Sequence, residues 1–100
     1  MASYVVVNVD VKDREQYREY NRLAPESIER FGGRYLARGG RAEKLEGGWE
    51  PKRFVVLEFP SYEKAKAWWS CAEYESAKGI RQRAASTEMI LVEGLNGAPF

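Results

Sequence analysis

The sequence contains no histidine and only one cysteine, Cys71. Histidine is the commonest general base near neutral pH, the commonest metal ligand and the usual proximal haem ligand. Its absence excludes Ser-His-Asp and Cys-His catalysis, and the scattered carboxylates argue against a metal site. A single cysteine cannot form an intrachain disulfide. We therefore expect no cofactor and no metal, and we interpret Cys71 as a small apolar residue at a helix junction.

The chain also lacks a strong excess of charge and a long apolar run. It has 16 basic and 15 acidic residues, a net charge of +1, whereas nucleic-acid binders usually carry a marked basic excess. No apolar run approaches the roughly 20 residues of a membrane span, and the first residues do not resemble a secretory signal. We therefore predict a cytoplasmic protein that binds neither nucleic acid nor membrane.

The first half of the 100-residue chain predicts a strand, a helix and a second strand. Residues 4–11 are rich in β-branched side chains, which is typical of a strand. A helix over 13–31 follows, with Asp13 as its N-cap, a kink or break at Pro25, and an end at Gly32. The next strand spans 34–45 and is interrupted by Gly39 and Gly40, which indicate a bulge or bend.

The second half repeats this order. The strand 53–59 is bulky and β-branched and is expected at the centre of the sheet. Ser61 caps a second helical region, which is expected to break and restart at a capping box formed by Ser70 and Glu73. Residues 87–93 form the last strand. The order βαββαβ predicts one ferredoxin-like α+β domain over residues 1–94, a four-stranded antiparallel sheet with helices on one face, and a loose tail over 95–100.

Alternation along the strands places apolar side chains on both faces of this sheet. If Val5 and Val7 point toward the helices, the opposite face of the sheet carries six apolar or aromatic side chains, namely Tyr4, Val6, Phe54, Val56, Ile90 and Val92. A soluble monomer rarely exposes so large a patch. We predict a homodimer that packs sheet to sheet, although strand twist and the long second strand could instead cover the patch.

Candidate polar site residues lie on the same open face. A carboxyl group among apolar neighbours loses hydration, which raises its pKa and suits it to general acid–base work. Glu58 is the candidate catalytic residue, with an ion pair to an arginine as the structural alternative. Asn8 is a candidate substrate-binding residue that would orient an oxygen, or else satisfy backbone groups. Asp10 is expected to be solvated.

Two further candidates for substrate binding are Arg38 and Trp69. Arg38 precedes the glycine pair, so a bend there would turn its guanidinium toward the pocket mouth to bind a carboxylate or enolate. The aromatic residues at helical spacing, Trp69 included, are interpreted as core first and as pocket lining second. The strand 53–59 lacks the glycine pattern of RNA-recognition domains, so RNA binding is not expected.

Several motifs together resemble one protein family. Phe31-Gly32-Gly33, Leu36-Ala37-Arg38-Gly39-Gly40, Glu58-Phe59-Pro60-Ser61 and the Glu73-Tyr74 pair resemble the DUF1330 family over nearly the whole chain, with Ala72 where this family often has proline. The resemblance implies a dimeric α+β barrel and no assigned catalytic residues. Two functions remain open: a cofactor-independent enzyme acting on a small organic acid or enolisable molecule, or a non-catalytic small-ligand-binding or stress-response dimer.

Overall fold

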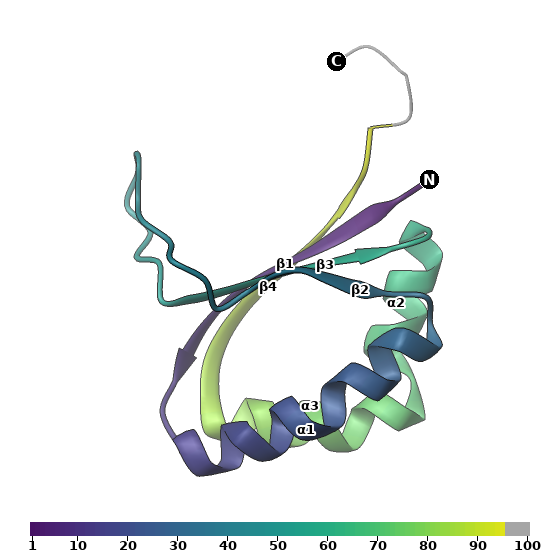
Figure 1. Cartoon of the computed structure of the whole chain (residues 1–100), viewed down its shortest axis with the longest axis horizontal. Coiled ribbons are helices and arrows are strands. Elements are labelled where there is room, and N and C mark those ends of the chain that lie inside the picture. Colours follow the sequence, from purple (N-terminus) through teal and green to yellow (C-terminus); the bar gives the residue numbers. More distant parts are fainter. Residues whose placement is uncertain (96–100) are drawn as a thin grey trace.

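The computed structural model describes residues 1–95, which form one antiparallel sheet and three helices. In chain order the elements are β1 (Ser3–Val11), α1 (Arg14–Arg30), β2 (Arg34–Arg38), β3 (Arg53–Phe59), α2 (Tyr62–Ser70), α3 (Ala72–Ala84) and β4 (Ala85–Glu93). The strands lie in the order β2-β3-β1-β4, and all neighbours are antiparallel. All three helices cover one face (Figure 1). The predicted ferredoxin-like α+β fold is confirmed. Residues 96–100 of the predicted tail lie outside the described part.

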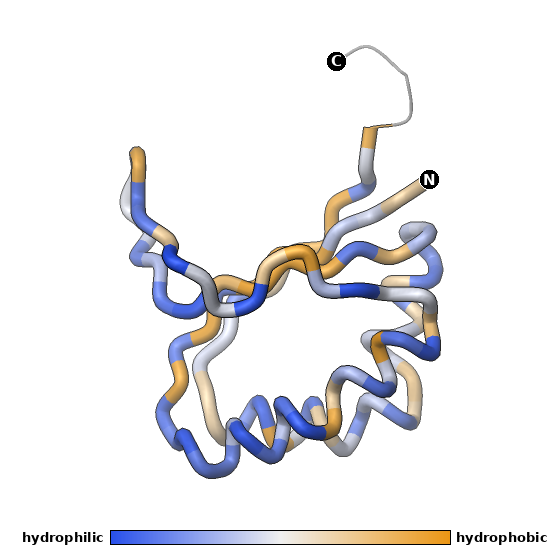
Figure 2. The backbone as a smooth tube through the Cα atoms, in the orientation of Figure 1, coloured by the Kyte–Doolittle hydropathy of each residue, from blue (hydrophilic) through white to orange (hydrophobic). Residues whose placement is uncertain are grey.

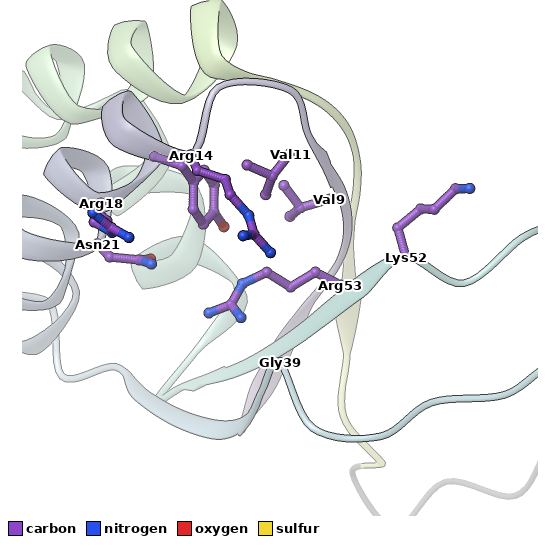
Figure 3. A pocket seen from close by; sticks show the side chains of 9 residues that line it. Val9, Val11, Arg14, Arg18, Asn21, Gly39, Lys52 and Arg53 are labelled. Atoms are coloured by element: carbon purple, nitrogen blue, oxygen red, sulfur yellow. The ribbon is translucent and has the colours of Figure 1, made fainter.

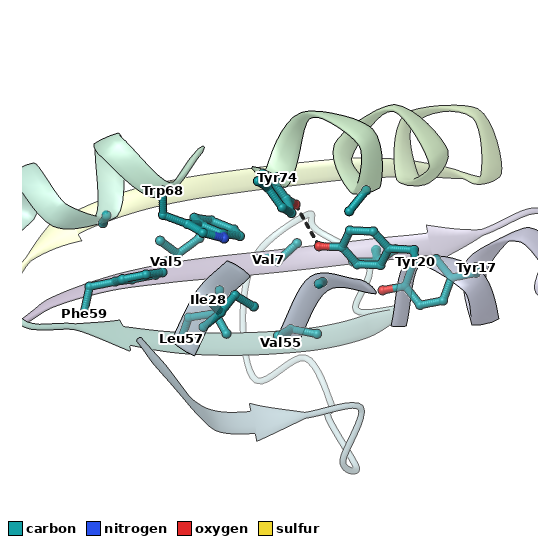
Figure 4. Close-up of a cluster of buried hydrophobic side chains, with 14 of the residues drawn as sticks. Val5, Val7, Tyr17, Tyr20, Ile28, Val55, Leu57, Phe59, Trp68 and Tyr74 are labelled. Carbon is teal, nitrogen blue, oxygen red and sulfur yellow. Dashed lines mark hydrogen bonds between the residues drawn. The ribbon is translucent and has the colours of Figure 1, made fainter. Parts of the chain in front are cut away.

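The core lies between this sheet face and the helices. Every second residue of β1 and β3 points inward, as strand geometry requires. The inward side chains meet three large aromatic residues, Phe59, Trp68 and Tyr74, each no more than 1% exposed. Figure 4 shows these rings packed over the valines of β1 and β3. Within residues 1–95, no helix combines the length and hydrophobicity that a membrane span requires.

Helix α1 begins as predicted but continues through Pro25. The Asp13 side chain accepts a hydrogen bond from the Gln16 backbone N–H at 3.1 Å. Of the two alternatives predicted at Pro25, a kink or a break, the break is wrong, since the helix is continuous over 17 residues. Proline lacks the N–H that would bond to the Asn21 carbonyl. Arg38 Nη2 donates to that carbonyl instead, at 3.4 Å, so part of the lost bond is replaced from β2.

Strand β2 is much shorter than predicted. It ends at Arg38, because Gly39 adopts a φ of 71° in the left-handed region that glycine favours and turns the chain away. Residues 40–52 carry no regular strand or helix and project from the body of the molecule (Figure 1). The pairing of β2 with β3 also shifts register between Tyr35 and Ala37, which makes a β-bulge at Leu36.

The second helical region breaks where it was predicted to, but a different residue caps the new helix. Ser61 caps α2 by accepting from the Lys64 N–H, as expected. At the break, Cys71 Sγ accepts from the Tyr74 N–H at 3.3 Å, so the predicted cap at Ser70 is wrong. Ser70 is still the last residue of α2, and its hydroxyl donates to the Lys66 carbonyl.

Candidate functional site

A basic cleft opens between the first half of α1 and the start of β3. Its volume is about 480 Å³, and Figure 3 shows its lining side chains. It is lined by Val9, Val11, Arg14, Tyr17, Arg18, Asn21, Gly39, Lys52 and Arg53. Four of these residues are cationic and none is acidic. In a chain with a net charge of +1, this local excess distinguishes the cleft from the rest of the surface.

Helix α1 supplies one wall of this cleft by its periodicity. Arg14, Tyr17, Arg18 and Asn21 follow at spacings of three, four and seven, so they share one helical face. Tyr17 is 6% exposed and anchors this face against the core, whereas Arg14 and Arg18 are exposed. The result is an apolar floor with guanidinium groups at its rim.

Strand β3 supplies Arg53, and Gly39 makes the space for it. A Cβ at Gly39 would lie 2.1 Å from Arg53 Nη1, so any other residue at position 39 would displace this guanidinium. The guanidinium carbon lies 5.7 Å from the centroid of the Tyr17 ring. Arg53 Nε is buried and has no hydrogen-bond partner within the described residues. A buried donor without a partner is costly.

The arginines of the cleft have no counter-ions of their own. Across residues 1–95, Arg14, Arg18 and Arg53 form no salt bridge, whereas seven other pairs do. The cationic Lys52 helps to lower the pKa of Asp10, although the main cause is a hydrogen bond from Lys12. Clustered guanidinium groups repel one another unless an anion lies between them. The charge of the cleft therefore favours an anionic ligand over a cationic one.

Behind the cleft lies a small cavity of about 20 Å³, and the two share Val9, Tyr17 and Asn21 in their linings. This volume holds about one water-sized group. The Tyr20 and Tyr74 hydroxyls lie 2.7 Å apart, as the dashed line in Figure 4 marks, and Arg81 Nε donates to Tyr74 Oη at 3.4 Å. Burial, reinforced by Tyr74, raises the pKa of Tyr20 well above its usual value. Tyr20 is therefore a neutral hydroxyl at physiological pH and not a base.

The predicted site residues Glu58 and Asn8 lie on the other face of the sheet. Glu58 accepts a hydrogen bond from Arg34 Nε at 2.7 Å, in a salt bridge across β2 and β3. The side chain of Asn8 makes two hydrogen bonds to the backbone just before β3. Its Nδ2 donates to the Glu50 carbonyl, and its Oδ1 accepts from the Lys52 N–H. Both contacts are the structural alternatives considered for these residues. Their roles with a substrate stay predictions.

Arg38 is separated from Glu58 by the β-bulge at Leu36. Arg34 pairs with Glu58 on the open face, but beyond the bulge Arg38 pairs with Val55, which is buried toward the helices. A bulge shifts the alternation by one residue, so Arg38 lies on the helix-covered side. Its guanidinium stacks on Tyr35, 4.4 Å from the ring centroid, and lines the small cavity. The structure therefore does not bring the two predicted residues together.

Trp69 and Asp10 also lie apart from each other and from the cleft. Trp69 is 44% exposed on α2, where Lys78 Nζ lies 3.7 Å from its ring centroid. Together with Tyr62 it lines a groove of about 550 Å³ beside β4. Asp10 pairs with Lys12 at 2.8 Å and is partly exposed. Among the described residues there is no grouping of three or more His, Cys, Asp or Glu that would hold a metal.

Sequence reasoning missed the cleft residues Arg14, Arg18, Asn21 and Arg53. One signal was present, because a helical face that carries two arginines and an asparagine around Tyr17 is unusually basic. The second wall could not be read from the sequence. Arg53 approaches this face only because the chain turns at Gly39 and leaves its guanidinium unobstructed.

These features define a ferredoxin-like α+β protein with a basic cleft between its helices and its sheet. The chain belongs to the family described as "Domain of unknown function (DUF1330)", whose model matches residues 2–95. No curated protein matches the sequence at a significant level.

Solved structures with the same fold share little sequence with this chain. RPA0582, a protein of unknown function from Rhodopseudomonas palustris, is 21% identical, with 95% of this chain and 83% of that chain covered and a TM-score of 0.75. SnoaB, a cofactor-independent oxygenase from Streptomyces nogalater, is 9% identical, with coverage of 99% and 98% and a TM-score of 0.65. A dimeric protein of unknown function from Bacteroides fragilis is 16% identical, with coverage of 93% and 96% and a TM-score of 0.53. At these identities the likeness extends to the fold.

Proposed function

We propose that this protein binds a small organic acid in the basic cleft. The observation that carries the proposal is the set of three arginines, Arg14, Arg18 and Arg53, which line one cleft and form no salt bridge among the described residues. Arginine presents a planar fork of donors that matches a carboxylate in a bidentate pair. Arg53 lines the cleft and supplies one such guanidinium.

The apolar part of the cleft accounts for the rest of the ligand. Val9 and Val11 from β1 and the ring of Tyr17 form the floor beneath the arginines. A carboxylate held at the rim therefore places its hydrocarbon body on these side chains. Both parts of an organic acid, the anion and the apolar body, find complementary surface here.

Isothermal titration calorimetry with benzoate tests this proposal. We expect saturable binding to the wild-type protein and an affinity at least about tenfold weaker for Arg53→Gln, because one guanidinium of the cleft is lost. Arg83→Gln is the matched control, since Arg83 also forms no salt bridge within residues 1–95 but lies on α3, outside the lining of the cleft. Absence of benzoate binding to the wild type, or equal weakening by both substitutions, would overturn the proposal.

A second candidate function is a cofactor-independent reaction of an enolisable acid bound in this cleft. The specific observation is the hydroxyl pair of Tyr20 and Tyr74 behind the cleft, together with Arg81. Neutral hydroxyls and a guanidinium stabilise the negative oxygen of an enolate. The fold is shared with an oxygenase that needs no cofactor. Binding ranks first, because the lining of the cleft offers no carboxylate to remove a proton.

Proton exchange separates the two candidates. An enzyme that enolises its substrate exchanges the α-protons of a bound keto acid with deuterium from D₂O, and proton NMR follows the loss of their signal. Pyruvate is the probe. Exchange above the buffer rate that is lost in Tyr20→Phe supports the enzyme, whereas binding without exchange leaves the chain a ligand-binding protein.

The proposed assembly is a homodimer that packs through the open face of the sheet. That face exposes Leu36, Ile90 and Val92, with Ile90 65% exposed. Figure 2 shows hydrophobic residues along the middle of the sheet, and a protein of the same fold is described as dimeric. We expect light scattering to report a dimer for the wild type and a monomer for Ile90→Glu. Ala67→Glu, on the exposed side of α2, is the control that should stay dimeric.

A further inference from the structure

The donors of the basic cleft form two groups rather than one. Figure 3 shows the side chains of Arg14 and Arg53 extending into the middle of the cleft from its two walls, and the side chains of Arg18 and Asn21 lying together toward its other end. Arg18 and Asn21 are three residues apart on α1, so neighbouring positions on the helix explain their pairing. The cleft thus has two places for a negatively charged group.

The spacing of these two groups follows from the geometry of α1. Four residues separate Arg14 from Arg18 and seven separate it from Asn21, which corresponds to about 6 Å and about 10 Å along the axis. Carbon–carbon bonds of about 1.5 Å place the carboxyl carbons of extended glutarate roughly 5 Å apart. The carboxylates of a short diacid are therefore separated by about the same distance as the α1 positions that carry donors of the two groups, whereas a single carboxylate reaches one group.

Both groups have free donors. Arg53 Nε is buried without a partner, and Arg14 and Arg18 form no salt bridge within residues 1–95. The side-chain amide of Asn21 makes no hydrogen bond to another described residue, although its backbone carbonyl accepts from Arg38. One monoanion leaves the arginine at the other end without a counter-charge. A dianion supplies acceptors to both ends.

We propose that the cleft is specific for a short dicarboxylic acid, with one carboxylate held by Arg14 and Arg53 and the other by Arg18 and Asn21. This inference rests on the proposed function of the cleft and specifies its ligand class. The apolar floor, formed by Val9, Val11 and the ring of Tyr17, then contacts the methylene chain between the carboxylates. Lys52 points away from the two groups, so it contributes only longer-range electrostatic attraction to an anion (Figure 3).

Calorimetry with pentanoate and glutarate tests the inference, because these acids have the same number of carbons and differ in the second carboxylate. At one ionic strength we expect glutarate to bind at least about tenfold more tightly than pentanoate. Arg18→Gln should bring the affinity for glutarate close to that for pentanoate, and should change the affinity for pentanoate by no more than about threefold. The control Arg83→Gln should leave both affinities unchanged.

A longer diacid separates geometry from charge. Suberate carries the same two charges as glutarate but holds them farther apart, so a site of fixed spacing prefers glutarate. Equal binding of glutarate and suberate, equal binding of glutarate and pentanoate, or the same loss for both acids in Arg18→Gln would overturn this inference alone. If neither pentanoate nor glutarate binds, the proposed function itself fails.

Discussion

The open face of the sheet and the cleft on its helix-covered side differ in whether their charged side chains are paired. On the open face, the carboxylate of Glu58 is paired with Arg34, and Asp10 is paired with Lys12. On the helix-covered side, Arg14 and Arg53 line a cleft without any acidic partner among the described residues. Paired charges neutralise each other and stabilise the protomer weakly, whereas unpaired cations in a cleft attract a ligand. This comparison is the reason that we propose ligand binding on the covered side and assembly on the open side.

The largest expected difference between the faces is in stability, and two phenylalanines of β3 test it. Phe59 is fully buried under Trp68, whereas Phe54 lies on the open face, where its ring meets Trp49 at 5.4 Å between centroids. Phe59→Ala should lower the free energy of unfolding by about 3–5 kcal/mol. Phe54→Ala should lower it by roughly 1–2 kcal/mol at low protein concentration.

Urea denaturation measures both losses. Equal losses at low protein concentration would mean that the open face is as well packed within the protomer as the covered face. Raising the protein concentration sharpens the comparison. Only the loss from Phe54→Ala should grow with concentration, because only the open face is proposed to be buried between two copies.

The next effect is on ligand binding and compares two exposed arginines on opposite faces. Arg14→Gln should weaken benzoate binding about tenfold, which corresponds to about 1.4 kcal/mol, because it removes one side of the cleft. Arg34→Gln should change the affinity by less than about twofold, since Arg34 forms its salt bridge with Glu58 on the open face of the sheet. Calorimetry measures both. A larger loss in Arg34→Gln would move the binding site to the open face.

A smaller effect appears at alkaline pH. The pKa of Tyr20 is raised in the folded protein, first by burial and then by Tyr74. A group whose pKa is higher in the folded state stabilises the fold fully below its unfolded pKa of about 10, and this contribution is lost as the pH rises further. We expect stability to fall above about pH 10 and to fall less steeply in Tyr20→Phe.

Thermal denaturation between pH 7 and pH 11 follows this dependence. At pH 7 Tyr20→Phe should cost about 1 kcal/mol for the lost hydrogen bond to Tyr74. Tyr4→Phe is the control, because Tyr4 is a half-buried tyrosine of the open face. If Tyr20→Phe and Tyr4→Phe flatten the alkaline fall equally, the buried hydroxyl pair is not its source.

The smallest effect concerns Arg38 and the carbonyl that Pro25 leaves free. Arg38→Met should cost about 0.5 kcal/mol, since a hydrogen bond of 3.4 Å is weak. In a Pro25→Ala background the helix supplies its own N–H to the Asn21 carbonyl, so Arg38→Met should then cost less. Urea denaturation of the four variants gives the coupling energy. Equal costs in both backgrounds would show that Arg38 does not compensate for the proline.

The fold follows from the sequence because its signals are local and agree with one another. The alternation of β1 and β3, the cap at Asp13 and the turn at Gly32 each predict what is observed. The cap at Cys71 was missed because a thiol is a weak acceptor and an uncommon N-cap, and the neighbouring Ser70 fits the capping box better.

The site followed less well, because it depends on features that alternation does not reveal. A one-residue bulge at Leu36 moves Arg38 to the other face from Glu58. The end of β2 at Gly39 leaves the space into which Arg53 extends. The glycine pair indicated a bulge or bend in this strand, but neither the position of the bulge at Leu36 nor the reach of an arginine across a turn can be derived from the spacing of residues. Glu58 was singled out because it is acidic on an apolar strand, but Arg34 already pairs with it.

The most direct test of the account is to map where a carboxylate binds. In a ¹H–¹⁵N correlation spectrum titrated with benzoate, we predict that the largest saturable shifts belong to the backbone amides of Arg14, Tyr17, Asn21, Gly39 and Arg53. The amides of Asn8 and Glu58, on the other face of the sheet, should stay within the noise. Saturable shifts centred on Asn8 and Glu58, with the amides of α1 unmoved, would contradict the account.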